Sequence, residues 1–413
     1  MDNAKIRNVF IIGSKSVGQY GGYETFVDKL TEYHQSAETI RYHITAKAAG
    51  SGCMDETKLE GVSGFCRGTD GAESSFVYHN AKIFKLKVPE MGPATAILYD
   101  VAACRFFIRY CRIHHIQRPV FYILACRIGP FIAGIKRRIR AIGGVLYINP
   151  DGHEWKRSKW SAPVRKYWKY SEKLMVRHAD LLICDAVAIE EYIQSEYGQY
   201  RPRTTFIPYG SETSESRMRD DDPMFLAWLN KNGVSPHQYD LVVGRFVPEN
   251  NYETMIREYM KSESKRKLVL ITNENPGLYK ELKERLRFDK DPRIVFAGPL
   301  YHGECLKKIR ENAYLYLHGH SVGGTNPSLL EALGSTELNL LFDVSFNREV
   351  AENCALYWTQ EPGDLAALLN RAGSMSFEER RAFGKKAKAR IEAAYNWETI
   401  ADAYEHVFKE EID

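Results

Sequence analysis

The chain has 413 residues, 44% hydrophobic and 27% charged, which is ordinary for a globular protein and long enough for two domains with separate cores. The start, MDNAKIRNVFII, runs directly into an apolar segment, so we expect no secretory signal. The longest apolar run, residues 119–135, is interrupted by Arg127 and Pro130 and is too short to span a bilayer. The eight cysteines form no C-x-x-C pair and no metal-ligand spacing, which favours a reducing, cytoplasmic setting.

Charge is unevenly distributed along the chain. The net charge is +4, yet residues 101–205 carry 19 Lys and Arg against 8 Asp and Glu, a local charge of +11. A basic segment beside an acidic remainder indicates either an anionic partner for the first half of the chain or a solvated basic face.

Short apolar runs alternate with segments of helical length throughout. Strands are predicted in the first half at 8–13, 41–45, 81–88, 120–124, 145–149, 181–185 and 204–208, and in the second half at 240–244, 267–272, 293–298, 314–319 and 338–343. Strand–helix alternation builds parallel sheets with helices on both faces. The pattern therefore predicts an α/β protein with two Rossmann-like domains facing a central cleft.

A polar segment marks the expected domain boundary. PYGSETSESRMRDDDP is loop-like and separates a first domain of residues 1–208 from a second of residues 209–395. Residues 396–413 contain a helix with one apolar face, which includes Trp397 and Tyr404. This helix needs a surface to cover, and the first domain is the candidate.

The first predicted strand leads into a glycine-rich loop, SKSVGQYGGYETFVDKL. Gly18, Gly21 and Gly22 precede a predicted helix. Glycines let the backbone approach a ligand closely, and a helix N-terminus favours phosphate. The spacing is not that of the dinucleotide-binding fingerprint, and a plain glycine-rich turn is the alternative interpretation.

Arg245 comes directly after the strand predicted at 240–244, the first of the second domain. Ligands bind at the carboxyl edge of open α/β sheets, and an arginine there suits a diphosphate because its guanidinium contacts two oxygens at once. The alternative is a surface arginine paired with Glu249.

A second candidate site in this domain is the segment HSVGGTNPSLLEALGS. Asn326 is suited to cap a helix, so the amides of Thr325 and Ser328 would face an anion or a sugar. Glu331 lies one turn further in and needs a hydrogen-bond donor, such as a ribose hydroxyl, unless it is exposed.

The segment NPDGHEWKRSKW follows the strand predicted at 145–149. Asp151, His153 and Glu154 come within a few residues of the strand's end, which indicates a site at the sheet edge. For Asp151 the alternative is an Asx-turn with Gly152. A basic aromatic run follows, with the members Trp155, Lys156, Arg157, Lys159, Trp160, Arg165, Lys166, Tyr167, Trp168, Lys169 and Tyr170.

In their order, these motifs resemble the family-4 glycosyltransferases with the GT-B fold, and the resemblance spans the whole chain. More narrowly, YGGYETFVDKL, NPDGHEWKRSKW, VGRFVPENNYETMI and GGTNPSLLEALGS resemble the bacterial polysaccharide β-1,4-L-rhamnosyltransferases. The resemblance implies transfer of L-rhamnose from dTDP-β-L-rhamnose, with retention, to glucose or N-acetylglucosamine on undecaprenyl diphosphate. It implies no cofactor and no metal, and a peripheral location on the inner face of the cell membrane.

The resemblance also implies residue roles. Gly21 and Gly22 would lie by the donor's diphosphate and sugar, Arg245 would bind the diphosphate, Thr325, Asn326 and Ser328 would line the sugar–phosphate end, and Glu331 would accept from the deoxyribose 3′-hydroxyl. Two positions depart from the wider family: Gly323 stands where an acid is usual, and Asn250 where a lysine is usual. The missing acid weakens the case for a glucose or mannose donor.

In the first domain, the resemblance implies that Asp151 orients the acceptor hydroxyl and supports positive charge on the sugar carbon. Asn149, His153 and Glu154 could share this task. The basic aromatic run suits a lipid headgroup layer, with Lys156, Arg157, Lys159, Trp160, Arg165 and Lys166 as the contacts. The alternative is a surface helix whose aromatic side lies in the core.

Three other functions remain open on the sequence. One is a family-4 transferase with a UDP- or GDP-sugar donor, and another is a sugar-nucleotide epimerase with the same fold. The third is a nucleic-acid-binding protein, suggested by the basic and aromatic residues. We expect no nucleic-acid partner, because the sequence contains no recognised nucleic-acid-binding motif.

Overall fold

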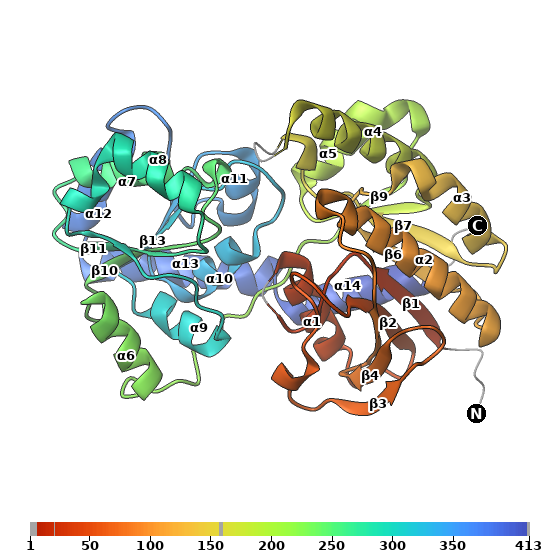
Figure 1. Cartoon of the computed structure of the whole chain (residues 1–413). Coiled ribbons are helices and arrows are strands. Elements are labelled where there is room, and N and C mark those ends of the chain that lie inside the picture. Colours follow the sequence, from red (N-terminus) through yellow and green to blue (C-terminus); the bar gives the residue numbers. More distant parts are fainter. Residues whose placement is uncertain (1–5, 20, 157–159, 411–413) are drawn as a thin grey trace. The chain divides into compact units, whose positions relative to one another are not determined.

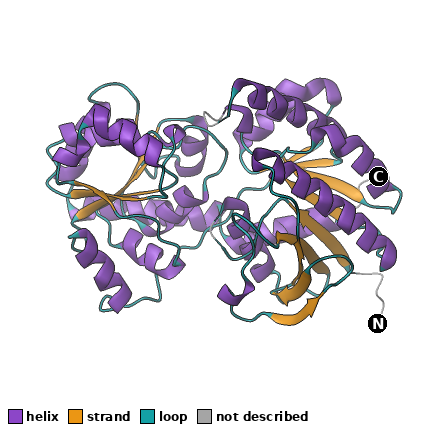
Figure 2. Cartoon of the chain, in the orientation of Figure 1, coloured by secondary structure: helices purple, strands orange, loops and turns teal. Residues whose placement is uncertain are grey.

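The computed structural model describes residues 6–19, 21–156 and 160–410. The chain divides into two compact units, which we call unit 1 (Met1–Tyr209 with Trp397–Asp413) and unit 2 (Gly210–Asn396). Both units consist of a sheet covered by helices (Figures 1 and 2). The predicted and observed boundaries differ by one residue, and the chain returns to unit 1 at its C-terminal end.

Unit 1 is built around a nine-stranded sheet. Its strands are β1 (Arg7–Ile12), β2 (Ile40–Lys47), β3 (Ser63–Arg67), β4 (Ser74–Tyr78), β5 (Ala81–Leu86), β6 (Val120–Leu124), β7 (Val145–Asn149), β8 (Leu181–Cys184) and β9 (Thr204–Phe206). Its helices are α1 (Gly22–Tyr33), α2 (Thr95–Ile113), α3 (Gly129–Arg140), α4 (Ala162–His178), α5 (Val187–Tyr197) and α14 (Trp397–Lys409). The strand order is β3-β4-β5-β2-β1-β6-β7-β8-β9.

The β3–β4 hairpin was not predicted, and it makes one edge of the sheet antiparallel. Antiparallel neighbours need only a short turn, whereas parallel neighbours need a crossover of a dozen residues or more. Gly61, Gly68 and Gly71 adopt positive φ around this hairpin and let the chain turn back. All five residues of β3 are exposed, so no alternation of apolar and polar side chains marked the strand.

Alternate residues of the unit 1 strands face two different helix layers. Phe10 and Phe121 belong to the core under α2, α3, α4 and α5. On the opposite face, the aromatic rings of Tyr122 and Tyr147 contact Phe408 of α14. Figure 1 shows this last helix, in blue, beside α1 and β1, which agrees with their contacts.

Unit 2 contains a six-stranded, wholly parallel sheet in the order β12-β11-β10-β13-β14-β15. The strands are β10 (Tyr239–Val243), β11 (Lys267–Ile271), β12 (Ile294–Phe296), β13 (Leu315–His318), β14 (Asn339–Phe342) and β15 (Leu356–Trp358), of which β15 was not predicted. The helices are α6 (Pro223–Asn232), α7 (Tyr252–Lys261), α8 (Pro276–Leu286), α9 (Gly303–Glu311), α10 (Pro327–Ser335), α11 (Ser345–Ala351), α12 (Asp364–Ser374) and α13 (Phe377–Ala394).

Each parallel sheet has one point at which the strand order reverses. This switch point lies between β1 and β6 in unit 1, and between β10 and β13 in unit 2. The loops that follow the two strands leave the sheet in opposite directions there, which opens a crevice at the carboxyl edge. Within each unit, the residues after these strands are therefore the first place to look for a site.

Candidate functional site

Asp151 lies at the carboxyl edge of the unit 1 sheet, two residues after β7. Its N–H donates to Oδ1 of Asn149 at 2.8 Å, and its own Oδ1 accepts the N–H of Gly152, also at 2.8 Å. Its φ of +59° is one that aspartate tolerates better than most residues. The Asx-turn is thus made by Asn149 over Asp151, and the Asp151 carboxylate adds a bond to the adjacent amide of Gly152.

A buried ion pair joins Arg127 to Asp100 beside the switch point of unit 1. Nη1 of Arg127 lies 3.1 Å from Oδ2 of Asp100 and donates to the carbonyl of Gly13, which follows β1. Burial alone would lower the pKa of Arg127, but the charges of Asp100 and Asp151 raise it above its ordinary value. Arg127 therefore stays charged, and the sequence did not indicate it as a site residue although it lies three residues after the apolar strand β6.

The hydroxyl of Tyr23, in the first turn of α1, is buried and has no hydrogen-bond partner among the described residues. Burial and then the charges of Asp151 and Asp185 raise the pKa of Tyr23 well above its ordinary value. A buried polar group without a partner costs about 1–3 kcal/mol. This hydroxyl is therefore a candidate contact for a ligand, and it lies within the electrostatic reach of Asp151.

His153 and Glu154 are held by aromatic neighbours. The His153 ring lies 4.2 Å from the ring of Tyr192. Burial, then the charges of Lys156 and Lys169, lower the pKa of His153 to about 4, so the imidazole is neutral near pH 7. Glu154 accepts a hydrogen bond from the indole N–H of Trp160 at 2.9 Å.

The basic aromatic run divides into exposed and engaged residues. Lys156, Arg165 and Lys166 are exposed, whereas Arg157 and Lys159 lie outside the described residues. Trp168 is only 9% exposed, so this ring belongs to the core rather than to a headgroup layer.

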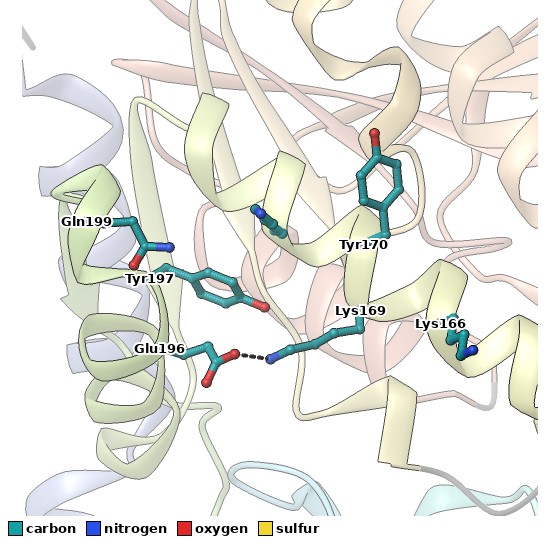
Figure 3. Close-up of a pocket in the computed structure, with 7 residues that line it drawn as sticks. Lys166, Lys169, Tyr170, Glu196, Tyr197 and Gln199 are labelled. Atoms are coloured by element: carbon teal, nitrogen blue, oxygen red, sulfur yellow. Dashed lines mark ion pairs between the residues drawn. The ribbon is translucent and has the colours of Figure 1, made fainter.

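Other members of this run are also committed to internal contacts. Tyr167 donates to the carbonyl of Arg127. Lys169 forms an ion pair of 2.9 Å with Glu196 (Figure 3). This pair lies in a shallow pocket of about 360 Å³ lined by Lys166, Lys169, Tyr170, Lys173, Glu196, Tyr197 and Gln199.

Gly21 directly precedes α1 and Gly22 is its first residue, and the two glycines have different surroundings. Gly21 precedes the helix, and a Cβ on it would lie 2.0 Å from Oε2 of Glu24. Oε1 of Glu24 in turn accepts the N–H of Lys15, which holds the loop after β1. Gly22 is exposed, and a Cβ there would meet nothing within 4 Å.

Arg245 stands at the switch point of unit 2, two residues after the end of β10. Its side chain is exposed and forms no ion pair with any residue that the structure describes, so the expected alternative partner Glu249 is not bound to it. The side-chain amide of Asn250 donates to the carbonyl of Arg245 at 2.8 Å. The residue in place of the family's usual lysine is thus 5% exposed and closes this turn.

The N-terminus of α10 lies at the same edge, and Asn326 caps it as predicted. Oδ1 of Asn326 accepts the N–H of Ser328 at 2.9 Å, so that amide is already bonded rather than open to a ligand, contrary to expectation. The Ser328 hydroxyl lies 2.8 Å from the hydroxyl of Tyr316 and donates to the carbonyl of Val243. Thr325 is 3% exposed.

Glu331 has a protein partner that the sequence did not indicate. Its carboxylate lies 2.5 Å from Nη2 of Arg310, whose side chain is 4% exposed, while the Glu331 side chain is 40% exposed. The Nε of Arg310 is buried without a hydrogen-bond partner among the described residues. The donor that a half-buried carboxylate requires is therefore supplied by the protein itself.

Comparison with known proteins shows the family of this chain. The family model for a domain of unknown function (DUF1972) matches residues 6–212, half of the chain. The chain belongs to this DUF1972 family. No curated protein matches the sequence significantly.

Solved structures are similar to the DUF1972 protein over nearly its whole length. Sucrose-phosphate synthase from Thermosynechococcus elongatus has a TM-score of 0.71 at 15% identity, with 98% of each chain covered. The E. coli trehalose-6-phosphate protein bound with UDP-2-fluoro glucose has a TM-score of 0.70 at 11% identity, covering 98% of this chain and 99% of that one. HepE from Anabaena in complex with UDP has 0.66 at 14%, covering 97% and 99%. These neighbours are GT-B glycosyltransferases, so the predicted α/β, GT-B fold is confirmed.

Within the parts of the DUF1972 chain that the structure describes, no three His, Cys, Asp or Glu residues gather as a metal site would require. None of the helices in those parts has both the length and the apolarity to cross a bilayer. Unit 1 offers the carboxylates of Asp100 and Asp151, the guanidinium of Arg127 and the buried hydroxyl of Tyr23. Unit 2 offers an exposed guanidinium beside a capped helix N-terminus.

Proposed function

We propose that the protein is a retaining glycosyltransferase that takes its sugar from a nucleotide donor. More specifically, we propose transfer of L-rhamnose from dTDP-β-L-rhamnose to glucose or N-acetylglucosamine on undecaprenyl diphosphate. The GT-B fold supports the general proposal, as do the structural neighbours bound to UDP and UDP-2-fluoro glucose. The specific donor and acceptor are supported by the four long motifs that resemble the rhamnosyltransferases.

The observation that carries the proposal is the exposed guanidinium of Arg245 at the switch point of unit 2. Without an ion-pair partner among the described residues, it retains its full capacity for a diphosphate, and the N-terminus of α10 lies after the neighbouring strand β13. Asn250 is neutral and its amide bonds the carbonyl of Arg245, so the positive charge that this turn offers to the donor comes from Arg245. Glu331, half exposed, would accept from the deoxyribose 3′-hydroxyl.

The reaction we propose breaks the bond between the sugar's anomeric carbon and the donor phosphate oxygen. A bond from the same carbon to the acceptor oxygen forms on the same face, and the acceptor proton passes to the departing phosphate. Asp151 would orient the acceptor hydroxyl and support the positive charge on the sugar carbon. Because the imidazole of His153 is neutral, it would hydrogen-bond the acceptor without placing a second positive charge near the sugar carbon.

The acceptor's lipid would bring the protein to the inner face of the cell membrane as a peripheral protein. Lys156, Arg165 and Lys166 are exposed in a segment with a charge of +11 and would meet anionic headgroups, with Trp160 beside them. Exchanging the three cations for glutamine should reduce binding to anionic vesicles and its sensitivity to salt. The same exchange at Lys280, Lys283 and Lys290 of unit 2 is the matched control. Equal binding by all variants would contradict the membrane contact.

A UDP-sugar donor is the second candidate, because the neighbours named above bind UDP or a UDP-sugar. The test is a screen of dTDP-L-rhamnose, UDP-glucose, UDP-N-acetylglucosamine and GDP-mannose against undecaprenyl-diphosphate-linked glucose and N-acetylglucosamine. We expect transfer from dTDP-L-rhamnose, abolished by Arg245→Ala and retained by the exposed control Arg371→Ala. Transfer from UDP-sugars alone would correct the donor. Conversion of a nucleotide sugar without acceptor would replace the transferase by an epimerase.

A further inference from the structure

Lys169 of α4 has an unusually complete set of partners for a lysine near the surface. Its ammonium donates to the hydroxyl of Tyr192 at 2.5 Å and lies 2.9 Å from a carboxylate oxygen of Glu196 and 3.5 Å from one of Glu172. Figure 3 shows its side chain running from α4 toward Glu196 and Tyr197, whereas Lys166, one turn earlier, points away. The protein thus holds this partly exposed cation in place through several partners.

The same ammonium lies over three aromatic rings. It is 4.8 Å from the ring centre of Trp155 and 5.0 Å from those of Tyr192 and Tyr197. A cation at these distances is attracted by the ring face, most strongly for tryptophan. Tyr192 also packs its ring on His153, so two residues of the loop 151–156 depend on this cluster.

The buried carboxylate of Glu172 binds both tyrosines of this cluster. Glu172 is 4% exposed, and its Oε1 accepts the hydroxyls of both Tyr192 (2.6 Å) and Tyr197. Charge-assisted hydrogen bonds to a buried carboxylate are strong and directional, which keeps the two rings in the positions that Lys169 requires. Lys169 therefore links Trp155 of the loop after β7 to α4 and α5, beside the direct contact of His153 with Tyr192.

We propose that Lys169 is a positioning residue, which holds the loop 151–156 against α4 and α5 and so presents Asp151 at the carboxyl edge of β7. This inference rests on the proposed function for its catalytic consequence, but not for the position of the loop. It separates Lys169 from its neighbours Arg165 and Lys166. The charges of Arg165 and Lys166 face solvent, whereas the charge of Lys169 is bound by Glu196 and Tyr192.

The test uses Trp155 as its own reporter. Acrylamide quenching is measured for the parent and for Lys169→Met, each with and without Trp155→Phe, so that the difference isolates Trp155 among the six tryptophans. We expect the accessibility of Trp155 to rise at least about twofold in Lys169→Met, because the loop loses its cationic partner. Lys169→Arg, which keeps the charge, should restore most of the protection. Lys173→Met is the matched control: it removes an exposed lysine from the next turn of the same helix.

Steady-state transfer to a soluble acceptor analogue supplies the second measurement. Misplacing a reacting group by about 1 Å can cost on the order of 100-fold in rate, so kcat in Lys169→Met should fall about 10- to 100-fold. The KM for the donor should stay near that of the parent, since Arg245 and Glu331 belong to unit 2 and the glycines proposed beside the donor, Gly21 and Gly22, lie outside the loop 151–156. If Lys169→Met does not fold, Lys169→Gln, which retains hydrogen-bonding groups, takes its place.

The outcomes separate this inference from the proposed function. Unchanged quenching of Trp155 in Lys169→Met overturns the positioning role whatever the activity. Increased quenching with parental kcat overturns its link to Asp151. If the parent transfers no sugar from any nucleotide donor, the proposed function fails, while the quenching result still decides whether Lys169 holds the loop.

Discussion

The ion pair between Glu331 and Arg310 leads to a prediction about stability as well as binding. In Glu331→Gln, the guanidinium of Arg310, whose side chain is 4% exposed, would remain buried with an uncharged partner. Removing one partner from a fully buried pair costs about 3–5 kcal/mol. Because the Glu331 side chain is 40% exposed, water screens the pair and can partly replace the lost carboxylate, so we expect about 1–2 kcal/mol.

Unit 2 spans Gly210–Asn396, a size at which 1 kcal/mol shifts the melting temperature by about 2–4 °C. Glu331→Gln should therefore lower the melting temperature of the unit 2 transition by roughly 2–8 °C. Differential scanning calorimetry without ligand measures this directly. Glu284→Gln, at a surface pair whose carboxylate is 67% exposed, should stay within about 0.5 kcal/mol of the parent.

A double-mutant cycle with Arg310→Met isolates the pair from other effects. Removing both charges should cost less than the sum of the single losses, with a coupling of about 0.5–3 kcal/mol. Donor affinity should fall in Glu331→Gln and in the double variant, because the neutral amide oxygen of glutamine is a weaker acceptor for the deoxyribose hydroxyl than the carboxylate. Strictly additive effects on stability, with a parental melting temperature for Glu331→Gln, would refute the role of this pair.

Three further predictions concern the loop 151–156, the donor and pH. Asp151→Asn keeps the turn, because asparagine also tolerates positive φ and accepts from the Gly152 amide. Its melting temperature and dTDP affinity should therefore match the parent while turnover falls about 10²–10³-fold, and near-parental turnover would leave Asp151 only a turn residue. In thermal-shift assays, dTDP should stabilise the protein more than UDP or GDP, and equal shifts would remove the dTDP assignment. Burial lowers the pKa of both His43 and His318 to about 3, below the ordinary 6.5, so the unfolded chain binds protons more readily. Stability in urea should therefore fall as pH drops from about 6.5 to 4 and change little above that range, and a flat profile would contradict this burial.

Much of the fold follows from local sequence patterns. Every strand predicted from an apolar run is present, because a strand buried on both faces requires a continuous apolar segment. Of the strands that the sequence did not indicate, β3 is exposed and β15 is short, and both lie at a sheet edge, where a strand needs no such pattern. The third, β4, is mostly buried, but it begins with two serines and so lacks a continuous apolar run. The cap of α10 by Asn326 was also predictable, since it depends on the residue's own chain neighbours.

Individual site residues were recognisable where they follow a strand. Arg245 and Asp151 could be named because the carboxyl ends of parallel strands meet at one edge, whatever the details of packing. Arg127 follows a strand in the same way, but its position in an apolar run suggested an interruption rather than a function. What each of these side chains contacts could not be read from the sequence.

Only the tertiary structure decided which charges are free and which are engaged. Arg245 follows an apolar strand and Lys169 lies within α4, and both are cations, yet the first is exposed and the second is held by carboxylates that lie 3 and 27 positions away. Glu331 and Arg310 are 21 positions apart and meet because α9 and α10 pack on the same face of one sheet. The sequence determined the strands, the switch points and the residue types at the sheet edges, since these depend on local hydrophobicity and chain order. The pairing of charges depends on which side chains the fold brings within a few ångströms, and that distance is set by the packing of helices, not by their order along the chain.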